Sequence, residues 1–245
     1  MNRTKIEWAT HTWNPFTGCS KVSEGCQNCY AEALTTRMML GYDFTPRYHP
    51  DRLAEIQNQD GPKIIFVCSM SDLFHESHNS MDIKSVLMAM IAQKHLNFVV
   101  LTKRPKRMHL ELGLLPMSIG NEDLNHVYFG VSLENTTSIE CIQRYETLID
   151  VQDTFDINTV ISFEPMLGAA KIFKPVDWVI CGAETGRNSR YCDQSWVRSI
   201  RNQCIEAEIP FFFKTFGKKS MNKVDGKIWH QFPEKLDGIK YMGDI

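Results

Sequence analysis

Residues 64–68 read Ile-Ile-Phe-Val-Cys, a run in which every side chain is apolar. A strand buried on one face alternates apolar with polar residues, whereas a continuous apolar run is typical of a parallel strand covered on both faces. Similar runs recur at residues 98–101, 127–131, 160–163, 178–181 and 211–213. With an early strand expected around residues 6–13, the pattern predicts about seven parallel strands.

Apolar residues at helical spacing separate most of these runs. Three helices are expected. The first has the apolar residues Ile83, Val86, Leu87, Met90 and Ile91, with Ser80 as its N-cap. The second has Ile139, Ile142, Tyr145 and Ile149, with Thr137 and Glu140 as a capping box, and the third has Val197, Ile200 and Cys204 after Asp193. A fourth helix is expected to begin near Tyr30 and to run past Met38. The interval between Phe163 and Trp178 leaves little room for a helix.

Strands and helices that alternate about every 30 residues are typical of βα units. A complete (β/α) barrel usually takes about 250 residues, and this chain of 245 residues must also hold a cysteine-rich loop and a tail. The expected fold class is therefore α/β, a partial or shortened (β/α) barrel with parallel strands. A doubly wound open sheet is the alternative, because periodicity does not reveal whether a sheet closes.

No long Gly, Ser or Pro linker divides the chain, so residues 1–245 are expected to form a single barrel-like domain. Within it we distinguish a cysteine loop at 14–30 and a C-terminal tail at 215–245, in which residues 229–233 are expected to pack as a lid.

The net charge of −2 excludes a strongly basic protein that coats nucleic acid, but not a local basic patch. No apolar run approaches the roughly 18 residues of a membrane span, and the N-terminus lacks the apolar stretch of a signal peptide. A cytoplasmic protein with no membrane partner is expected.

Polar and charged residues cluster directly after the apolar runs. In parallel α/β folds, ligands bind at the carboxyl ends of the strands. We therefore expect one pocket that contains several of these residues: Ser69, Asp72, Lys103, Ser132, Glu134, Glu164, Gly182, Glu184 and Lys214. The alternative is that the charged members form salt bridges that close the mouth of the barrel.

Three cysteines lie close together with the spacing C-x6-C-x2-C, namely Cys19, Cys26 and Cys29. Thiolates suit zinc and iron–sulfur clusters. A structural zinc ion needs four ligands, whereas three cysteines on a [4Fe–4S] cluster leave one iron open. A zinc site that recruits His11, His49 or Cys68, a redox pair formed by Cys26 and Cys29, and coincidental core cysteines are the alternatives.

The remaining cysteines lie on strand or helix patterns and are expected to be small buried side chains, except for one that stays unassigned. The first group is Cys68, Cys141, Cys181 and Cys204, and the unassigned residue is Cys192.

Several stretches together resemble the phage-associated three-Cys-motif family of unknown function. They are residues 4–8, 13–32, 49–53, 69–75, 101–105, 130–132, 163–165, Gly182 with Glu184, and 211–214. That family is similar to radical S-adenosylmethionine enzymes, and the Cys29-Tyr30-Ala31 sequence is similar to the Cys-Tyr-Leu of spore photoproduct lyase, a radical DNA-repair enzyme. The usual spacing in those enzymes is C-x3-C-x2-C, which differs from the spacing here.

The resemblance implies a [4Fe–4S] cluster held by Cys19, Cys26 and Cys29, with S-adenosylmethionine chelated at the open iron and cleaved to a 5′-deoxyadenosyl radical. It implies candidate catalytic residues and candidate cofactor-binding residues. The catalytic set is Tyr30, Asp72, Lys103 and Glu164, and the cofactor-binding set is Asn14, Ser69, Ser132, Glu134, Gly182, Glu184 and Lys214. Glu184 is expected to accept from the methionine ammonium group, with Asp72 or Glu164 as the alternative. Tyr30 can alternatively be a core ring.

Two basic groups follow strand ends and can neutralise phosphates, which would give salt-dependent binding to DNA or RNA. They are residues 103–107, and Lys214 with Lys218, Lys219 and Lys223. The leading hypothesis is an iron–sulfur, radical S-adenosylmethionine-like enzyme that acts on a nucleic acid or nucleotide in repair or modification. A zinc-stabilised nucleic-acid-binding protein and an iron–sulfur redox module without radical catalysis are the alternatives. The family resemblance also implies a protein partner, the three-Cys-motif partner.

Overall fold

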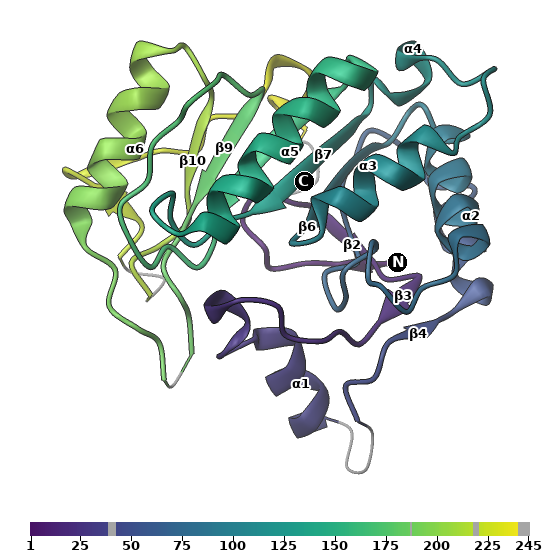
Figure 1. Ribbon diagram of the computed structural model, residues 1–245, viewed down its shortest axis with the longest axis horizontal. Coiled ribbons are helices and arrows are strands. Elements are labelled where there is room, and N and C mark those ends of the chain that lie inside the picture. The colour runs from purple at the N-terminus through teal and green to yellow at the C-terminus, as the bar shows by residue number, and fades with distance from the viewer. Residues whose placement is uncertain (39–42, 187, 218–220, 240–245) are drawn as a thin grey trace.

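A sheet of eight strands forms the centre of the molecule (Figure 1). The structure is a computed structural model that describes residues 1–38, 43–186, 188–217 and 221–239. The strands of this sheet are β1 (Asn2–Arg3), β2 (His11–Trp13), β5 (Ile64–Val67), β6 (Asn97–Thr102), β7 (Val127–Ser132), β8 (Asn158–Phe163), β9 (Trp178–Cys181) and β10 (Phe211–Phe213). Two short antiparallel pairs lie outside it: β3 (Phe16–Thr17) with β4 (Arg47–Tyr48), and β11 (Lys223–Val224) with β12 (Lys227–Ile228).

Helices alternate with these strands along the chain. The α-helices are α1 (Tyr30–Met38), α2 (Ser80–Ile91), α3 (Pro105–Gly113), α4 (Asn121–Leu124), α5 (Ile139–Phe155) and α6 (Gln194–Glu206). The 3₁₀ helices are η1 (Glu24–Cys26), η2 (Pro50–Ile56) and η3 (Glu234–Leu236). As expected, no helix forms between β8 and β9. The predicted continuation of α1 past Met38 lies outside the described residues.

The strand order of the sheet is β1-β2-β5-β6-β7-β8-β9-β10, so each strand lies beside the one that precedes it in the chain. Every pair from β2 to β10 is parallel, and only β1 runs antiparallel to its neighbour. A doubly wound sheet reverses its strand order at a switch point, so that alternative is wrong. The predicted partial barrel is confirmed, and it stays open between β1 and β10.

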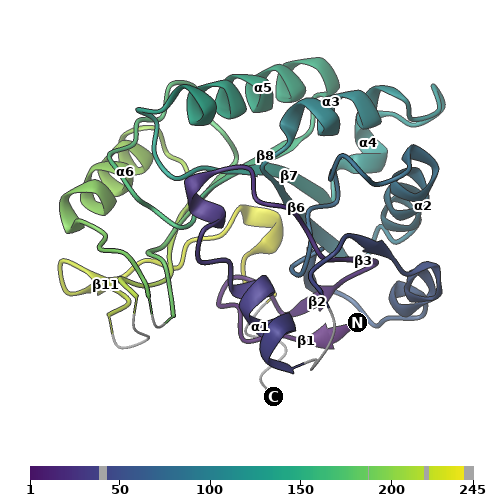
Figure 2. The ribbon, with the colours of Figure 1, turned by 60° about the horizontal axis from the view of Figure 1, so that its bottom comes forward.

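Most side chains on both faces of the sheet are buried, which is why the strands are mainly apolar runs. One face packs against the outer helices, with Val100, Phe129 and Ile161 among the buried residues. The inner face carries a second cluster that includes Tyr128, Trp178 and Phe212. Figure 2 shows α2, α3, α5 and α6 outside the arc of strands and the yellow C-terminal segment inside it.

The end of the described C-terminal tail packs on part of the inner face of the sheet. Phe232, Leu236 and Ile239 are buried against the inner cluster, and Trp178 Nε1 donates to Gln231 O at 3.0 Å. The backbone of Trp229 accepts from Phe213 N at 2.7 Å, which aligns the tail along the edge strand β10. Residues 229–233 therefore pack against the sheet, as the lid prediction requires.

The predicted helices exist, but two of their N-caps and one buried face differ from the prediction. Asn79, not Ser80, caps α2, because its Oδ1 accepts from Met81 N at 2.8 Å and leaves the Ser80 hydroxyl to bond elsewhere. Ser138, not Thr137, caps α5, and its Oγ accepts from Cys141 N at 3.4 Å. The third helix, α6, follows Asp193 as expected, and Asp193 is its N-cap.

The buried face of α5 is rotated from the predicted one. Its buried residues are Cys141, Arg144, Tyr145, Leu148 and Val151, whereas Ile139 is 69% exposed and Ile142 and Ile149 are half-buried. A buried arginine replaces an apolar residue on this face, and apolar periodicity alone does not detect it. Among the described helices, none is both long and apolar enough to cross a membrane.

Candidate functional site

The cysteine loop lies across the carboxyl ends of the strands and is bonded to the segment after β5. Gly18 N donates to Met70 O at 2.9 Å, and Ser71 Oγ donates to Gly18 O at 2.6 Å. Asn14 Oδ1 accepts from Ser69 Oγ at 3.1 Å and from Met70 N at 3.0 Å. The predicted residues Asn14 and Ser69 are therefore brought together, and they fix the start of the loop.

Tyr30 lies at the other end of this loop, at the first position of α1. Its hydroxyl donates to Ser69 O at 2.5 Å, and its side chain remains 46% exposed. The alternative in which Tyr30 is a core ring is therefore wrong. Its hydroxyl is oriented toward the carboxyl end of β5.

Asp72 and Arg104 form a buried ion pair beneath Cys19. Arg104 Nη1 lies 3.0 Å from Asp72 Oδ2 and 3.7 Å from Cys19 Sγ, and Nη2 donates to Ser20 Oγ at 3.0 Å. Asp72 also accepts from Thr102 Oγ1 at 2.7 Å and from Lys103 N at 3.1 Å. These bonds join the ends of β5 and β6 to the first cysteine.

Glu134 follows β7 and is 1% exposed. Its carboxylate accepts from Ser23 Oγ at 2.7 Å and from Arg144 Nη2 at 3.0 Å, and it lies 3.2 Å from Lys103 Nζ. Cys141 Sγ donates to the same carboxylate at 3.0 Å, so this cysteine is buried, as expected, but is also a hydrogen-bond donor. Although burial opposes ionisation, the charges of Lys103 and Arg144 and the two hydrogen bonds lower the pKa of Glu134 to about 2.

Glu184 follows β9 and bonds to both the cysteine loop and its own loop. Arg190 Nη2 lies 2.5 Å from Glu184 Oε1, and Arg190 Nε donates to Oε2 at 3.0 Å. Asn28 Nδ2 donates to Glu184 Oε2 at 2.9 Å, and Arg190 Nη2 also donates to Glu24 O at 3.1 Å. The bonds from Arg190 are the main cause that lowers the pKa of Glu184 to about 2.

Glu164 and Lys214 form the more accessible charged pair of the mouth. Lys214 Nζ lies 2.7 Å from Glu164 Oε1, and their side chains are 26% and 18% exposed. Ser162 Oγ donates to Glu164 Oε2 at 3.2 Å. A Cβ atom on Gly182 would lie 2.8 Å from Glu164 Oε1 and 3.3 Å from Lys214 Cβ, so glycine allows this pair to lie close to the end of β9.

Ser132 ends β7 directly opposite Ser162 of β8. Its carbonyl accepts from Arg144 Nη1 at 2.7 Å. The network of ion pairs thus contains the predicted residues Asp72, Lys103, Glu134, Glu164, Glu184 and Lys214. Each of these acids has a cationic partner, which is the arrangement expected of salt bridges at a barrel mouth. Their assignment to catalysis or cofactor binding stays a prediction.

The three loop cysteines are half-buried free thiols. Among the described residues, no three His, Cys, Asp or Glu side chains form a ready-made metal site. The donor chemistry nevertheless fits a cluster with three thiolate ligands, because cations accompany two of the thiols. The Arg104 guanidinium is 3.7 Å from Cys19 Sγ, and the Lys103 charge, with a backbone hydrogen bond at Val22, lowers the pKa of the Cys26 thiol against the opposing effect of burial.

Cys19 differs from Cys26 in its electrostatic surroundings. Burial and the Asp72 charge raise the pKa of its thiol to about 11, although Arg104 acts in the opposite direction. A metal that displaces the proton would remove this penalty, because cysteine binds metals as the thiolate.

The three residues considered as a fourth zinc ligand lie in different parts of the fold. His49 Nε2 bonds to Thr17 Oγ1 at 2.7 Å. His11 begins β2, at the amino end of the strand, and bonds to Thr10 Oγ1 at 3.0 Å. Cys68 directly follows β5 and is buried, and its backbone N donates to Trp13 O at 2.8 Å. Cys181, Cys192 and Cys204 are buried in the core.

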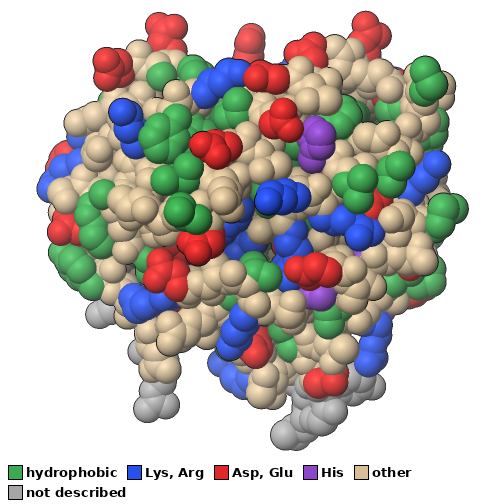
Figure 3. Space-filling view, viewed as in Figure 1, with side chains coloured by type: hydrophobic (Ala, Val, Ile, Leu, Met, Phe, Trp, Pro, Cys, Tyr) green, Lys and Arg blue, Asp and Glu red, His purple; other side chains and the backbone are tan. Residues whose placement is uncertain are grey.

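Lys and Arg side chains gather in a hollow between the α3–α5 layer and the cysteine loop (Figure 3). Most of the predicted basic run already has carboxylate partners: Lys103 with Glu134, Arg104 with Asp72 and Glu76, and Arg107 with Glu111. In the described part of the chain, Lys106 alone of this run has no ion-pair partner, and it is exposed. Lys218 and Lys219 lie outside the described residues.

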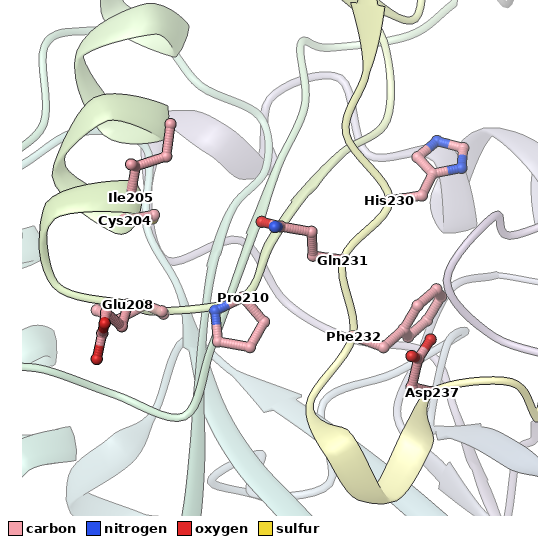
Figure 4. A pocket seen from close by; sticks show the side chains of 9 residues that line it. Cys204, Ile205, Glu208, Pro210, His230, Gln231, Phe232 and Asp237 are labelled. Carbon is pink, nitrogen blue, oxygen red and sulfur yellow. The ribbon is translucent and has the colours of Figure 1, made fainter.

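A recess of about 530 Å³ lies elsewhere, at the amino end of β10 (Figure 4). Its lining includes Pro210, Gln231 and Asp237. Because Pro210 precedes β10 and Lys214 follows it, the recess and the cysteine loop belong to opposite ends of the strand.

Sequence reasoning missed four residues that complete the mouth. They are Ser23, Asn28, Arg144 and Arg190. Arg144 lies three and four positions from Cys141 and Leu148 on one helix face, but this spacing alone does not show that an arginine there is buried. The loop residues carried no such local signal, since their partners are more than 100 positions away for Ser23 and Asn28.

A family model described as "Protein of unknown function (DUF5131)" matches residues 3–243. None of the curated proteins matches this sequence. Two solved structures of spore photoproduct lyase have a similar fold at 14% sequence identity. A Cys-to-Ser mutant covers 74% of this chain and 57% of its own, with a TM-score of 0.52. A double mutant with bound AdoMet and dinucleoside spore photoproduct covers 98% of this chain and 62% of its own, with a TM-score of 0.53. This chain thus corresponds to less than two thirds of the length of either lyase chain.

Proposed function

We propose that this chain, which belongs to the family described as "Protein of unknown function (DUF5131)", is an iron–sulfur, radical S-adenosylmethionine-like enzyme that acts on a nucleic acid or nucleotide. The observation that carries the proposal is the cysteine loop. Three half-buried thiols lie at the carboxyl ends of a parallel partial barrel, with the Arg104 guanidinium 3.7 Å from Cys19 Sγ.

The residues named for the cluster are Cys19, Cys26 and Cys29. A [4Fe–4S] cluster with S-adenosylmethionine would supply one-electron reductive chemistry at this mouth. Arg104 lies where its guanidinium offsets thiolate charge at Cys19, and Lys103 does the same at Cys26. Burial of Asp72 and Glu134 keeps these cations in place.

Glu164 and Lys214 are the pair proposed to contact the cofactor or substrate. They are partly exposed, and the neighbouring inner-face positions carry the small side chains of Ser132, Ser162 and Gly182. A zwitterionic or phosphate-bearing ligand can exchange its own charges for those of this ion pair. Tyr30, with its hydroxyl at the carboxyl end of β5, is proposed as a catalytic residue at the same mouth.

Two observations support a nucleic acid or nucleotide as the substrate. The similar double mutant of spore photoproduct lyase has a bound dinucleoside spore photoproduct, and Lys and Arg side chains gather in the hollow beside the cysteine loop. Phosphate groups are the ligands that such a hollow attracts.

The test begins with anaerobic purification and analysis of iron, sulfide and zinc. We expect about four irons per chain, reduced sharply in the Cys26→Ser variant and unchanged in the Cys192→Ser variant, which alters a buried cysteine outside the loop. Stoichiometric zinc without iron would favour the zinc-stabilised alternative. Reduction of the iron-loaded protein with S-adenosylmethionine should then release 5′-deoxyadenosine. If the iron-loaded protein releases none, the alternative of an iron–sulfur redox module without radical catalysis remains.

A further inference from the structure

Glu134 is almost completely enclosed, so it is poorly placed to touch a ligand. Its side chain is 1% exposed, and its four partners are Ser23, Lys103, Cys141 and Arg144. Ser23 is the residue just before η1, the 3₁₀ turn that ends at Cys26. The carboxylate is therefore bonded to the loop and not to the open space of the mouth.

A second contact joins the same carboxylate to this turn. A Cβ atom on Gly25 would overlap with Glu134 Oε1 and lie 2.7 Å from Glu134 Cγ. The turn can approach the carboxylate so closely only because residue 25 is glycine. The neighbouring Asn135 adds a longer hydrogen bond, from its Nδ2 to Glu24 Oε1 at 3.4 Å.

We propose that Glu134 is a positioning residue of the cysteine loop, which fixes the turn carrying Cys26 through Ser23 and Gly25. Arg144 of α5 and Lys103 after β6 hold the carboxylate ionised, and the ionised carboxylate holds the Ser23 hydroxyl. The end of β7 thereby sets the position of the second cysteine. The benefit of this arrangement for a cluster rests on the proposed function, but the restraint on the loop does not.

The chain contains a matched control for this arrangement. Glu111 is also buried, and it accepts from Ser80 Oγ at 2.8 Å and from Arg107 Nε at 2.6 Å. This serine–glutamate–arginine group joins α2 to α3 and also bonds to His78 O, and none of its hydrogen bonds within the described residues reaches the cysteine loop. Ser80→Ala therefore removes a similar hydrogen bond from the fold while leaving the loop contacts intact.

The experiment measures amide hydrogen exchange of residues 20–28 in the metal-free protein. We expect Ser23→Ala to raise exchange in this segment about tenfold or more, since a hydrogen bond to a charged group is lost. Ser23→Thr, which keeps a hydroxyl, should restore the wild-type rate, and Ser80→Ala should not change it. Ser23→Ala leaves Glu134 with both cations, so near-UV circular dichroism should confirm an intact fold.

A second measurement is the iron retained after reconstitution, which should fall in Ser23→Ala and Gly25→Ala but not in Ser80→Ala. Exchange in Ser23→Ala equal to that of the wild type would overturn the proposal. If exchange rises as expected while even the wild-type protein binds no iron, the positioning role stands and the proposed function fails.

Discussion

The inner face of the sheet has two halves with opposite chemistry, although the same strands build both. Toward the amino ends, the inward side chains are large rings, such as Tyr128, Trp178 and Phe212. Toward the carboxyl ends, the inward positions change to small or charged residues. On successive strands these are Ser132, then Ser162 with Glu164, then Gly182, then Lys214.

The apolar half of the inner face therefore contributes mainly to stability, and the polar half is the one suited to ligand binding. Rings from the N-terminal segment and from the tail, including Trp8 and Phe232, complete the apolar half. Among the described residues, no comparable cluster of rings packs in the polar half, and the cysteine loop lies across it. A parallel barrel can therefore be filled from one end and remain available for chemistry at the other.

The largest expected effect is in the apolar half. Trp178 is fully buried and packs against Phe232 with ring centroids 5.4 Å apart. Trp178→Ala should lower the free energy of unfolding by about 3–5 kcal/mol, because a large cavity is left. In the polar half, Ser162→Ala should cost only about 1 kcal/mol. Urea denaturation measures both, and equal losses would remove the distinction between the halves.

Acid should destabilise the polar half through Glu134. Its pKa is about 2 in the folded protein, so the stability that it contributes is present above the unfolded value of about 4.5 and is lost as the pH falls toward 2. At about 1.4 kcal/mol per pKa unit, Glu134→Gln should cost up to about 3 kcal/mol at pH 7. The difference from the wild type should shrink below pH 4.5. A difference that is independent of pH would show that charge at residue 134 is unimportant.

A histidine beside the cysteine loop should give a second acid effect of similar size in a different pH range. His78 stacks on Phe16 with centroids 4.0 Å apart, and burial lowers its pKa to about 4. In the unfolded chain His78 binds a proton near pH 6.5, whereas in the folded protein it does so only near pH 4. The free energy of unfolding therefore falls as the pH drops through this interval. His78→Phe should flatten the pH dependence of unfolding between pH 6.5 and 4, and an unchanged slope would contradict the assignment.

The smallest expected effect concerns nucleic acid at the rim. Because Arg107 is already paired with Glu111 at 2.6 Å, Lys106→Ala should lower the slope of log K against log salt by about one, and Arg107→Ala by less. Titration of labelled single- and double-stranded oligonucleotides at several salt concentrations measures this slope. Equal slopes for all three proteins would place any binding elsewhere, and no binding at low salt would leave a free nucleotide as the proposed substrate.

Much of the fold could be predicted because its signals are local. The run at residues 178–181 is β9 as observed, and the helix after Asp193 has the expected buried residues. The error on α5 shows the limit of this reasoning. Arg144 takes a buried position that apolar periodicity assigns to a hydrophobic side chain, and it does so because Glu134 lies opposite.

The sequence by itself determined the parallel strands, the polar residues that follow them and the spacing of the three cysteines, because each of these is set by a few consecutive residues. Only the tertiary structure decided which charges meet. Ser23 bonds to Glu134 and Asn28 bonds to Glu184 across more than 100 residues of chain. Likewise, the described tail residues Phe232, Leu236 and Ile239 pack in the apolar half of the inner face. Such pairings depend on strand order and on the direction in which side chains point, and no local pattern encodes either.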